Sequence, residues 1–202
     1  PDINYAVSRL SQFSQDPRDI HYSTAIRLLK YLLNTNSYKL HYNGKISTSN
    51  TSYIEQGKKG KLTMAYCDAS FNSDPKTSKS VSGFLVSIYG APVTWKTKRQ
   101  TVVATSSAYS EYVALSEACK EIIYVRQLAR ELGCKEKEPT DLFCDSAAAI
   151  AITKNPGFTQ SSKSIRLSYH NVRDCQEQKI ICIRKINGKE NPADILTKPL
   201  SI

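Results

Sequence analysis

Two short apolar segments of this chain each end in the pair Cys-Asp, and this repeat constrains the fold more than any other feature. Segment 61–68, KLTMAYCD, alternates larger and smaller side chains with the period of two that is typical of a β-strand. Segment 140–145, TDLFCD, is a second apolar run that ends in the same way. Asp is a poor strand residue, so one such Asp indicates only a turn. Two such strands predict that Asp68 and Asp145 lie side by side in a sheet.

Carboxylates placed side by side repel each other unless a cation lies between them. Hard oxygen ligands favour Mg²⁺ or Mn²⁺ over softer metals. The pair therefore indicates a metal site of this kind. The alternative, that each Asp only begins a loop, stays open at this point.

The charge of the chain narrows the choice of partners. Its 202 residues include 28 Lys and Arg against 18 Asp and Glu, a formal net charge of +10. Such an excess predicts a polyanionic partner, most simply nucleic acid, although an inert basic surface has the same composition. No apolar run approaches the ~20 residues of a membrane-spanning helix, so we expect no membrane partner. The length suits one domain with an extension, or two small domains.

The six cysteines form no C-x-x-C pair and no Cys/His cluster with zinc spacing. Several occupy apolar positions of the expected strands and helices, which is typical of reduced, buried thiols.

The first sixty residues differ from the rest. Apolar residues at helical spacing predict helices over 3–13 and 19–33, and 38–42 has the composition of a short strand. Residues 43–60 are rich in Asn, Ser, Thr, Gly and Lys, which indicates a flexible linker. Two short helices bury little surface by themselves, so we expect them to pack on a neighbouring domain.

From residue 61 onward, strands and helices alternate in a pattern that predicts an α/β domain. After the first strand we expect strands 81–89 and 92–97, a long helix 107–132, the strand 140–145, helices 146–154 and 161–178, the strand 179–186, and a last helix that begins at Asn191.

Two further acids fall at marked places in this order. Glu111 lies in the first turn of the long helix and on its apolar stripe, four residues before Leu115. Asp194 lies in the first turn of the last helix. Favourable interaction with the helix dipole accounts for either acid. The alternative is that both face Asp68 and Asp145 and complete one site.

The sequence around these acids resembles a known family. The segments YCDASFNSDPKTSKSVSGF, APVTWKTKRQTVVATSSAYSEYVALSEA, LFCDSAAAI and NPADILTKPL are similar to the RNase H domain of copia-type (Ty1/copia, Pseudoviridae) retrotransposon polyproteins. The opening PDINYAVSRLSQF resembles the tail of the reverse transcriptase of the same polyprotein. The resemblance covers almost the whole chain.

The resemblance implies an RNase H-like α/β fold, in which a mixed five-stranded sheet is flanked by helices and preceded by a small helical extension. It implies three parts: a helical reverse transcriptase tail at 1–42, a linker at 43–60 and an RNase H domain at 61–202. The family's site would then fall on the four acids already singled out, which would hold two Mg²⁺ ions with Mn²⁺ as a substitute: Asp68, Glu111, Asp145 and Asp194.

The activity that the resemblance implies is hydrolysis of the RNA strand of an RNA–DNA hybrid during reverse transcription. Asp68 would bridge both metal ions. The expected partners are the hybrid and the polymerase domain of the same polyprotein, and the expected location is a cytoplasmic virus-like particle or the nucleus. Candidates for contacts to 2′-hydroxyls are Ser70, Asn72 and Ser107, and candidates for contacts to DNA phosphates are Lys96, Lys98 and Arg99.

The chain departs from the family pattern at three positions. Tyr109 stands where the family has Glu, Ser146 where it has Asn, and Ser164 where it has His. None of the three is an expected metal ligand. The alternatives to an enzyme are a nucleic-acid-binding module of the same fold that no longer cuts, and a structural part of a larger reverse transcriptase. The retention of all four acids favours the enzyme.

Overall fold

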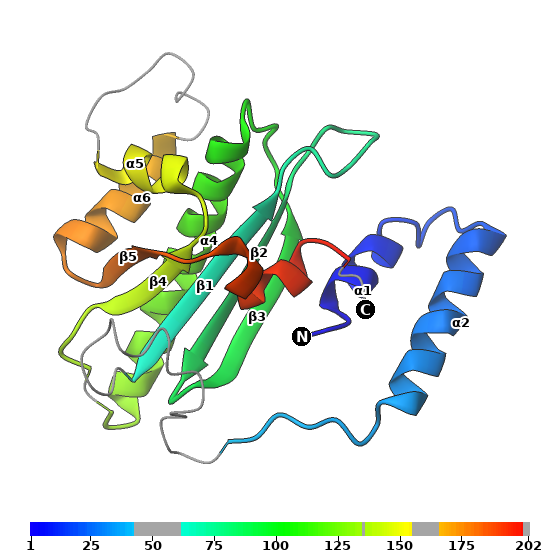
Figure 1. The fold of residues 1–202 in the computed structure, drawn as a ribbon, viewed down its shortest axis with the longest axis horizontal. Helices are drawn as coiled ribbons and strands as arrows, with labels where there is room; N and C mark the ends of the chain where they lie inside the picture. Colours follow the sequence, from blue (N-terminus) through cyan, green and yellow to red (C-terminus); the bar gives the residue numbers. More distant parts are fainter. Residues whose placement is uncertain (43–61, 135, 155–165, 200–202) are drawn as a thin grey trace.

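The computed structural model describes residues 1–42, 62–134, 136–154 and 166–199. Its centre is a five-stranded sheet with the strand order β3-β2-β1-β4-β5 (Figure 1). The strands are β1 (Thr63–Ser70), β2 (Val81–Ile88), β3 (Ala91–Arg99), β4 (Thr140–Cys144) and β5 (Ile181–Lys185). The predicted α/β class and the mixed five-stranded sheet are confirmed.

The directions of the strands decide where the two Cys-Asp pairs meet. β1 runs antiparallel to β2, and β2 antiparallel to β3, whereas β1 and β4 are parallel, as are β4 and β5. In the ladder between the parallel strands, Tyr66 pairs with Phe143. Each of these residues stands two positions before an Asp. Parallel strands end at the same edge of a sheet, so Asp68 and Asp145 are brought together there.

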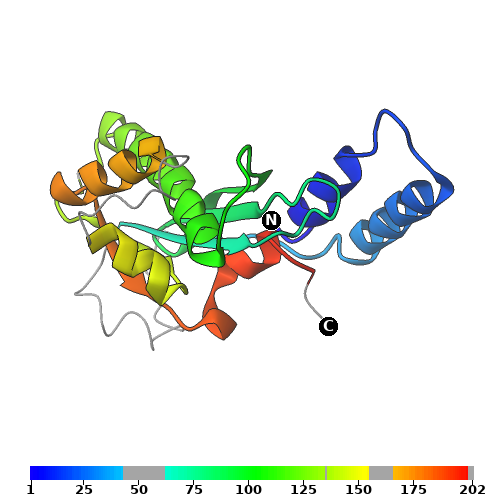
Figure 2. The same cartoon turned by 90° about the horizontal axis from the view of Figure 1, so that it is seen from above.

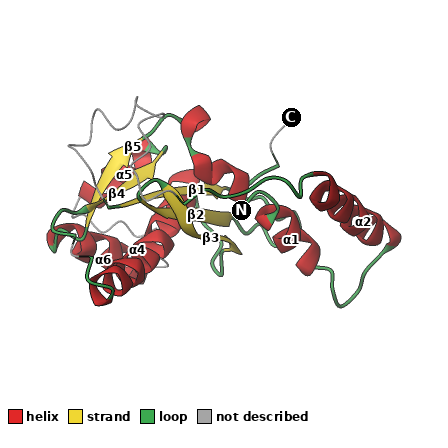
Figure 3. Cartoon of the chain, turned by 90° about the horizontal axis from the view of Figure 1, so that it is seen from below, coloured by secondary structure: helices red, strands yellow, loops and turns green. Residues whose placement is uncertain are grey.

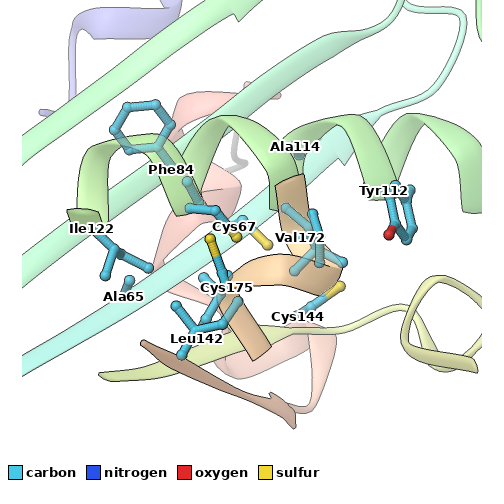
Figure 4. Close-up of a cluster of buried hydrophobic side chains, with 14 of the residues drawn as sticks. Ala65, Cys67, Phe84, Tyr112, Ala114, Ile122, Leu142, Cys144, Val172 and Cys175 are labelled. Carbon is cyan, nitrogen blue, oxygen red and sulfur yellow. The ribbon is translucent and has the colours of Figure 1, made fainter. Parts of the chain in front are cut away.

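One long helix covers one face of the sheet (Figures 1 and 2). This helix, α4 (Ser107–Glu131), begins after Ser106, whose Oγ accepts a hydrogen bond from the backbone N–H of Tyr109 at 3.3 Å. Also present are α5 (Ala147–Lys154) and α6 (Arg166–Glu177). The side chains of α4, the sheet and α6 form a single apolar core (Figure 4).

The last predicted helix is a 3-10 helix rather than an α-helix. It spans Pro192–Leu196, is labelled η4, and follows the short 3-10 turn η3 (Gly188–Glu190). Asn191 caps it as expected, since its Oδ1 accepts from the backbone N–H of Ala193 at 3.1 Å. The element is too short to pack as an α-helix does, and it lies on the face of the sheet opposite α4 (Figure 2).

The predicted strand at 38–42 is wrong, because these residues pair with no strand in the described parts of the chain. A strand needs a neighbour to satisfy its backbone groups. The hydrogen bonds of this segment among the described residues are not those of a strand ladder: the backbone N–H of Tyr38 donates to the carbonyl of Thr35 at 2.9 Å, and the hydroxyl of Tyr42 donates to the carbonyl of Pro92 at 2.8 Å. Two other predicted features, the linker at 43–60 and the start of the helix at 161–165, lie outside the described residues.

The two predicted N-terminal helices are present as α1 (Asn4–Ser11) and α2 (Asp19–Asn34). α1 contacts the sheet through Asn4, whose Nδ2 donates to Thr97 Oγ1 at 3.0 Å. Thr97 Oγ1 in turn donates to the carbonyl of Leu196 in η4 at 2.7 Å. α2 stands apart from the sheet (Figure 3) and leaves large apolar side chains exposed, among them Leu33.

Candidate metal centre

The structure brings the four predicted acids to one edge of the sheet. Together with the Sγ of Cys144, their ligand atoms form two groups of three, and within each group all atoms lie within 4.8 Å of one another. One group is Asp68, Asp145 and Asp194, and the other is Glu111, Cys144 and Asp145. Asp145 is common to both. Asp68 lies in β1, and Asp145 directly follows the last residue of β4. Glu111 lies in α4, and Asp194 lies in η4.

Asp68 is held on the face of the sheet that carries η4. Its side chain is buried, and its Oδ2 accepts a hydrogen bond from the hydroxyl of Thr197. Asp68 pairs with Gly83 across β1 and β2. Alternation along β2 places Phe84 in the core beneath α4, so position 83 faces the opposite way, toward η4.

Gly83 is a site residue that the sequence analysis missed. A Cβ at this position would lie 2.7 Å from Thr197 Cγ2 and 2.8 Å from Leu196 Cβ. The absence of a side chain therefore lets η4 approach the backbone of β2 closely. The signal in the sequence was a glycine inside the apolar strand VSGFLVSI, a place where glycine often marks close approach of another segment.

Asn191 ties the start of η4 to β1. Besides capping η4, its Nδ2 donates to the carbonyl of Cys67, the residue before Asp68, at 2.9 Å. Asn191 is buried, so neither hydrogen bond can be replaced freely by water. The side chain thus fixes the position of Asp194 relative to Asp68.

Replacement of Asn191 by Ala is expected to lower the free energy of unfolding by about 2 kcal/mol, because a cap and a buried hydrogen bond are lost together. Chemical denaturation measures this change. Asn191→Asp is the matched comparison, since it keeps the capping oxygen but loses the donor to Cys67. Equal stability of Asn191→Ala and the wild type would contradict the role assigned to Asn191.

Glu111 is a buried carboxyl group, with 8% of the residue exposed. Burial, and then the negative charge of Asp68, raise the pKa of Glu111 to about 9, although a hydrogen bond from the backbone N–H of Ala69 favours the charged form. Its Oε2 has no hydrogen-bond partner among the described residues. A buried, unpaired carboxylate oxygen of this kind is what a bound cation would satisfy.

The other acids show the same crowding. The pKa of Asp68 is raised to about 6, first by burial and also by the negative charge of Asp194, while the hydrogen bond from Thr197 opposes the rise. Asp194 is balanced by Lys198, whose Nζ lies 2.8 Å from its Oδ2. The Oδ1 of Asp194 has no hydrogen-bond partner in the described parts of the chain.

Because the pKa of the buried Glu111 is raised, we expect Glu111→Gln to increase the free energy of unfolding of the metal-free chain at pH 8 by about 2 kcal/mol or more. One unit of pKa corresponds to about 1.4 kcal/mol. The folded chain holds the Glu111 proton up to a pH of about 9, and the unfolded chain releases it near 4.5. Between these values unfolding releases a proton, so the wild type loses stability as the pH rises. Gln has no proton to lose.

Urea unfolding at pH 5 and pH 8 in the presence of a chelator tests this expectation. The gain from Glu111→Gln should be large at pH 8 and small at pH 5. Glu177→Gln, at an exposed acid on α6, should show no such difference. A gain that does not depend on pH would contradict the assignment.

The residues predicted to contact 2′-hydroxyls lie around the same edge of the sheet. Ser70 ends β1, two residues after Asp68. Asn72 follows in the turn with a positive φ of 50°, and its backbone N–H donates to Ser80 Oγ at 3.1 Å. Ser107 begins α4, one helical turn before Glu111. All three are thus within four residues of Asp68 or Glu111 along the chain, and their contact with substrate stays a prediction.

The three predicted phosphate-binding residues lie on the edge strand β3. Lys96 is exposed. Lys98 and Arg99 instead form ion pairs within the chain: Lys98 Nζ lies 3.4 Å from Glu117 Oε2, and Arg99 Nη1 lies 2.8 Å from Asp74 Oδ2. Arg99 therefore ties the 71–80 loop to β3. Any role of Lys98 or Arg99 in binding phosphate would compete with these pairs.

The donor set fits hard divalent cations. Carboxylate oxygens dominate both groups of three, two of these oxygens lack partners within the described chain, and two of the carboxyl groups have raised pKa values. A cation such as Mg²⁺ would relieve this repulsion. Cys144 is the exception, because sulfur is not a ligand that Mg²⁺ prefers.

No family model matches the chain. Over 98% of its length it is 32% identical to the retrovirus-related Pol polyprotein from transposon TNT 1-94 of Nicotiana tabacum, and over its whole length 31% identical to that from transposon RE2 of Arabidopsis thaliana. It spans only 14% and 13% of these two proteins. Its fold is similar to that of LC11-RNase H1, isolated from compost, with a TM-score of 0.51 and 13% identity over 68% of this chain and 94% of that one.

Proposed function

Because the chain belongs to the Pol polyproteins of Ty1/copia-type retrotransposons, of which it is one segment, we propose that it is a ribonuclease H that cuts the RNA strand of RNA–DNA hybrids during reverse transcription. The observation that carries the proposal is the convergence of Asp68, Glu111, Asp145 and Asp194 at the edge where two parallel strands end. Its RNase H fold supports the same activity, although a fold alone does not decide function.

The four acids would hold the metal ions. Asp68, Asp145 and Asp194 supply the ligands on the side of η4, and Glu111 with Asp145 supplies those on the side of α4. Two Mg²⁺ ions, or Mn²⁺ as a substitute, would supply Lewis-acid stabilisation of the attacking water and of the leaving 3′ oxygen. Asp145 belongs to both groups of three, and the charge of Asp68 contributes to the raised pKa of Glu111, so both Asp residues would help to hold the ions.

Other residues would hold these acids in the orientation that metal binding requires. The hydroxyl of Thr197 holds one carboxylate oxygen of Asp68, and Asn191 fixes η4 against β1. Lys198 neutralises Asp194 until a cation is bound. These contacts hold the carboxylates in place before the substrate arrives, so little reorganisation accompanies the reaction.

Recognition of the hybrid requires contacts that distinguish its two strands. Ser70, Asn72 and Ser107 would contact the 2′-hydroxyls of the RNA strand. The edge strand β3 would contact the phosphates of the DNA strand through Lys96, and through Lys98 and Arg99 if their ion pairs open. The formal charge of +10 supports such a partner.

We propose that the chain consists of three parts. Residues 1–42 would be the tail of the reverse transcriptase, 43–60 a linker and 61–202 the RNase H domain. The exposed apolar side chains of α2 would then pack on the polymerase domain of the same polyprotein, within virus-like particles in the cytoplasm or in the nucleus. No described helix has both the length and the apolar composition of a membrane span.

Incubation of the chain with an RNA–DNA hybrid, labelled on either strand, tests the proposal. We expect RNA fragments and intact DNA when Mg²⁺ is present, no cutting with a chelator, and no cutting of double-stranded DNA. Tight, salt-sensitive binding without cutting would instead support a binding module. Cutting only after the polymerase domain is added would support a structural part of a larger enzyme.

A further inference from the structure

One group of three brings a sulfur atom to the edge of the site. The Sγ of Cys144 lies within 4.8 Å of carboxylate oxygens of both Glu111 and Asp145. The proposed hydrolysis makes no use of this sulfur. Cys144 is the last residue of β4 and lies in the core beneath α4, together with Cys67 of the neighbouring strand (Figure 4).

Cys144 is a buried thiol that lies among polar groups of fixed position. Cys144 is fully buried, and Glu111 is nine-tenths buried with its Oε2 unpartnered within the described chain. The backbone N–H of Ser146 donates to Cys144 Sγ at 3.4 Å, which orients the sulfur. One sulfur and two carboxylates on rigid elements make a ligand set that differs in kind from the oxygen-only group of Asp68, Asp145 and Asp194.

We propose that Glu111, Cys144 and Asp145 form a binding site for one thiophilic divalent cation, such as Zn²⁺ or Cd²⁺. Three protein ligands of this type leave a fourth, tetrahedral position for water. On binding, the Cys144 thiol and, near neutral pH, the Glu111 carboxyl group each release a proton to solvent as they bond to the metal, and no oxidant or reductant is needed.

Occupation of this site would block the proposed nuclease. Glu111 and Asp145 cannot serve a thiophilic ion at Cys144 and also hold Mg²⁺ in the arrangement required for hydrolysis. Zn²⁺ binds well to protein sites that have nitrogen or sulfur ligands, whereas Mg²⁺ prefers sites that have only oxygen ligands. This inhibition rests on the proposed function, but the binding itself depends only on the geometry of the three residues.

The test is titration of the metal-free chain with Cd²⁺, followed through the ultraviolet thiolate-to-Cd²⁺ charge-transfer absorption. A Cys134→Ser chain serves as the reference, because Cys134 is exposed and would bind Cd²⁺ by itself. We expect one Cd²⁺ per chain. Cys144→Ser should remove the band or weaken binding by at least about 100-fold, since loss of even an outer-shell partner of a metal ligand costs 10–100-fold.

Two further variants make the result decisive. Cys175→Ser removes another buried thiol of the same core, on α6, and should leave the band unchanged. Glu111→Gln keeps the thiol and should keep the band at weaker affinity, which provides a test if Cys144→Ser does not fold. A band that persists at full strength in Cys144→Ser, or no band in the reference, overturns the proposal.

A cleavage assay in Mg²⁺ separates this proposal from the previous one. Zn²⁺ should inhibit the reference chain at concentrations at least tenfold lower than Cys144→Ser, each compared with its own uninhibited rate. A chain that binds Cd²⁺ through Cys144 but cuts no hybrid overturns the proposed function alone. A chain that cuts hybrid but shows no charge-transfer band overturns the thiophilic site alone.

Discussion

Replacement of Asp145 by Asn is expected to lower the rate of Mg²⁺-dependent cleavage of an RNA–DNA hybrid by about 10³-fold or more, because loss of a single stabilising contact in a preorganised site already costs 10²–10³-fold. Asp145 belongs to both groups of three potential metal ligands, so its replacement removes a ligand from each group. Asn keeps the size of the side chain but removes a negative charge that the metal requires.

Asp174→Asn is the matched control, since Asp174 is an exposed acid on α6. Its rate should equal that of the wild type. Asp145→Asn should fold and should not lose stability without metal, because it relieves repulsion among carboxylates that lie close together. If the folded Asp145→Asn variant cut hybrid at the wild-type rate, the acids would not be the catalytic site.

Replacement of Gly83 by Ala is expected to have the second-largest effect, about a 100-fold loss of cleavage and a loss of about 2 kcal/mol in stability, within the range for overpacked sites. The new Cβ would meet Thr197 and Leu196 at less than 3 Å, so η4 must move away from β2. Movement of η4 displaces Asp194 and withdraws the hydroxyl that holds Asp68. Cleavage rate and urea unfolding measure the two losses.

A compensating change shows whether this clash is the cause. Thr197→Ser keeps the hydroxyl but removes Cγ2, the atom that the new Cβ would approach to 2.7 Å. The double variant should therefore recover part of both the stability and the activity lost in Gly83→Ala, while Thr197→Ser alone should have little effect. No recovery in the double variant would mean that position 83 acts by another route.

The part of the fold that the sequence predicted is the part governed by local patterns. The repeated Cys-Asp ending of two apolar segments predicted that Asp68 and Asp145 lie side by side in a sheet. The structure has them close together, each directly beyond or at the end of one of two parallel strands. Glu111 was marked by its place on the apolar stripe of α4. The periodic spacing of apolar residues in strands and helices can be recognised from the sequence alone, because it repeats over neighbouring residues.

The rest depended on contacts between residues far apart in the sequence. The approach of η4 to Gly83, and the hydrogen bond from Asn191 to Cys67, have no local pattern that fixes their partner. The predicted strand at 38–42 was wrong because a strand depends on a neighbour as well as on composition. The basic run on β3 gave no sign that Lys98 and Arg99 are paired with acids.

The place of η4 in the chain has a consequence for biosynthesis. Thr197 is 129 residues from its partner Asp68, and Asn191 is 124 residues from its partner Cys67. Long-range contacts of this kind form late, and a chain emerges from the ribosome with its N-terminal parts first. A nascent chain that has not yet exposed Asp194 carries the sheet and three of the acids but lacks the fourth. In the proposed nuclease, incomplete translation products would therefore lack one of the four acids that hold the metal ions.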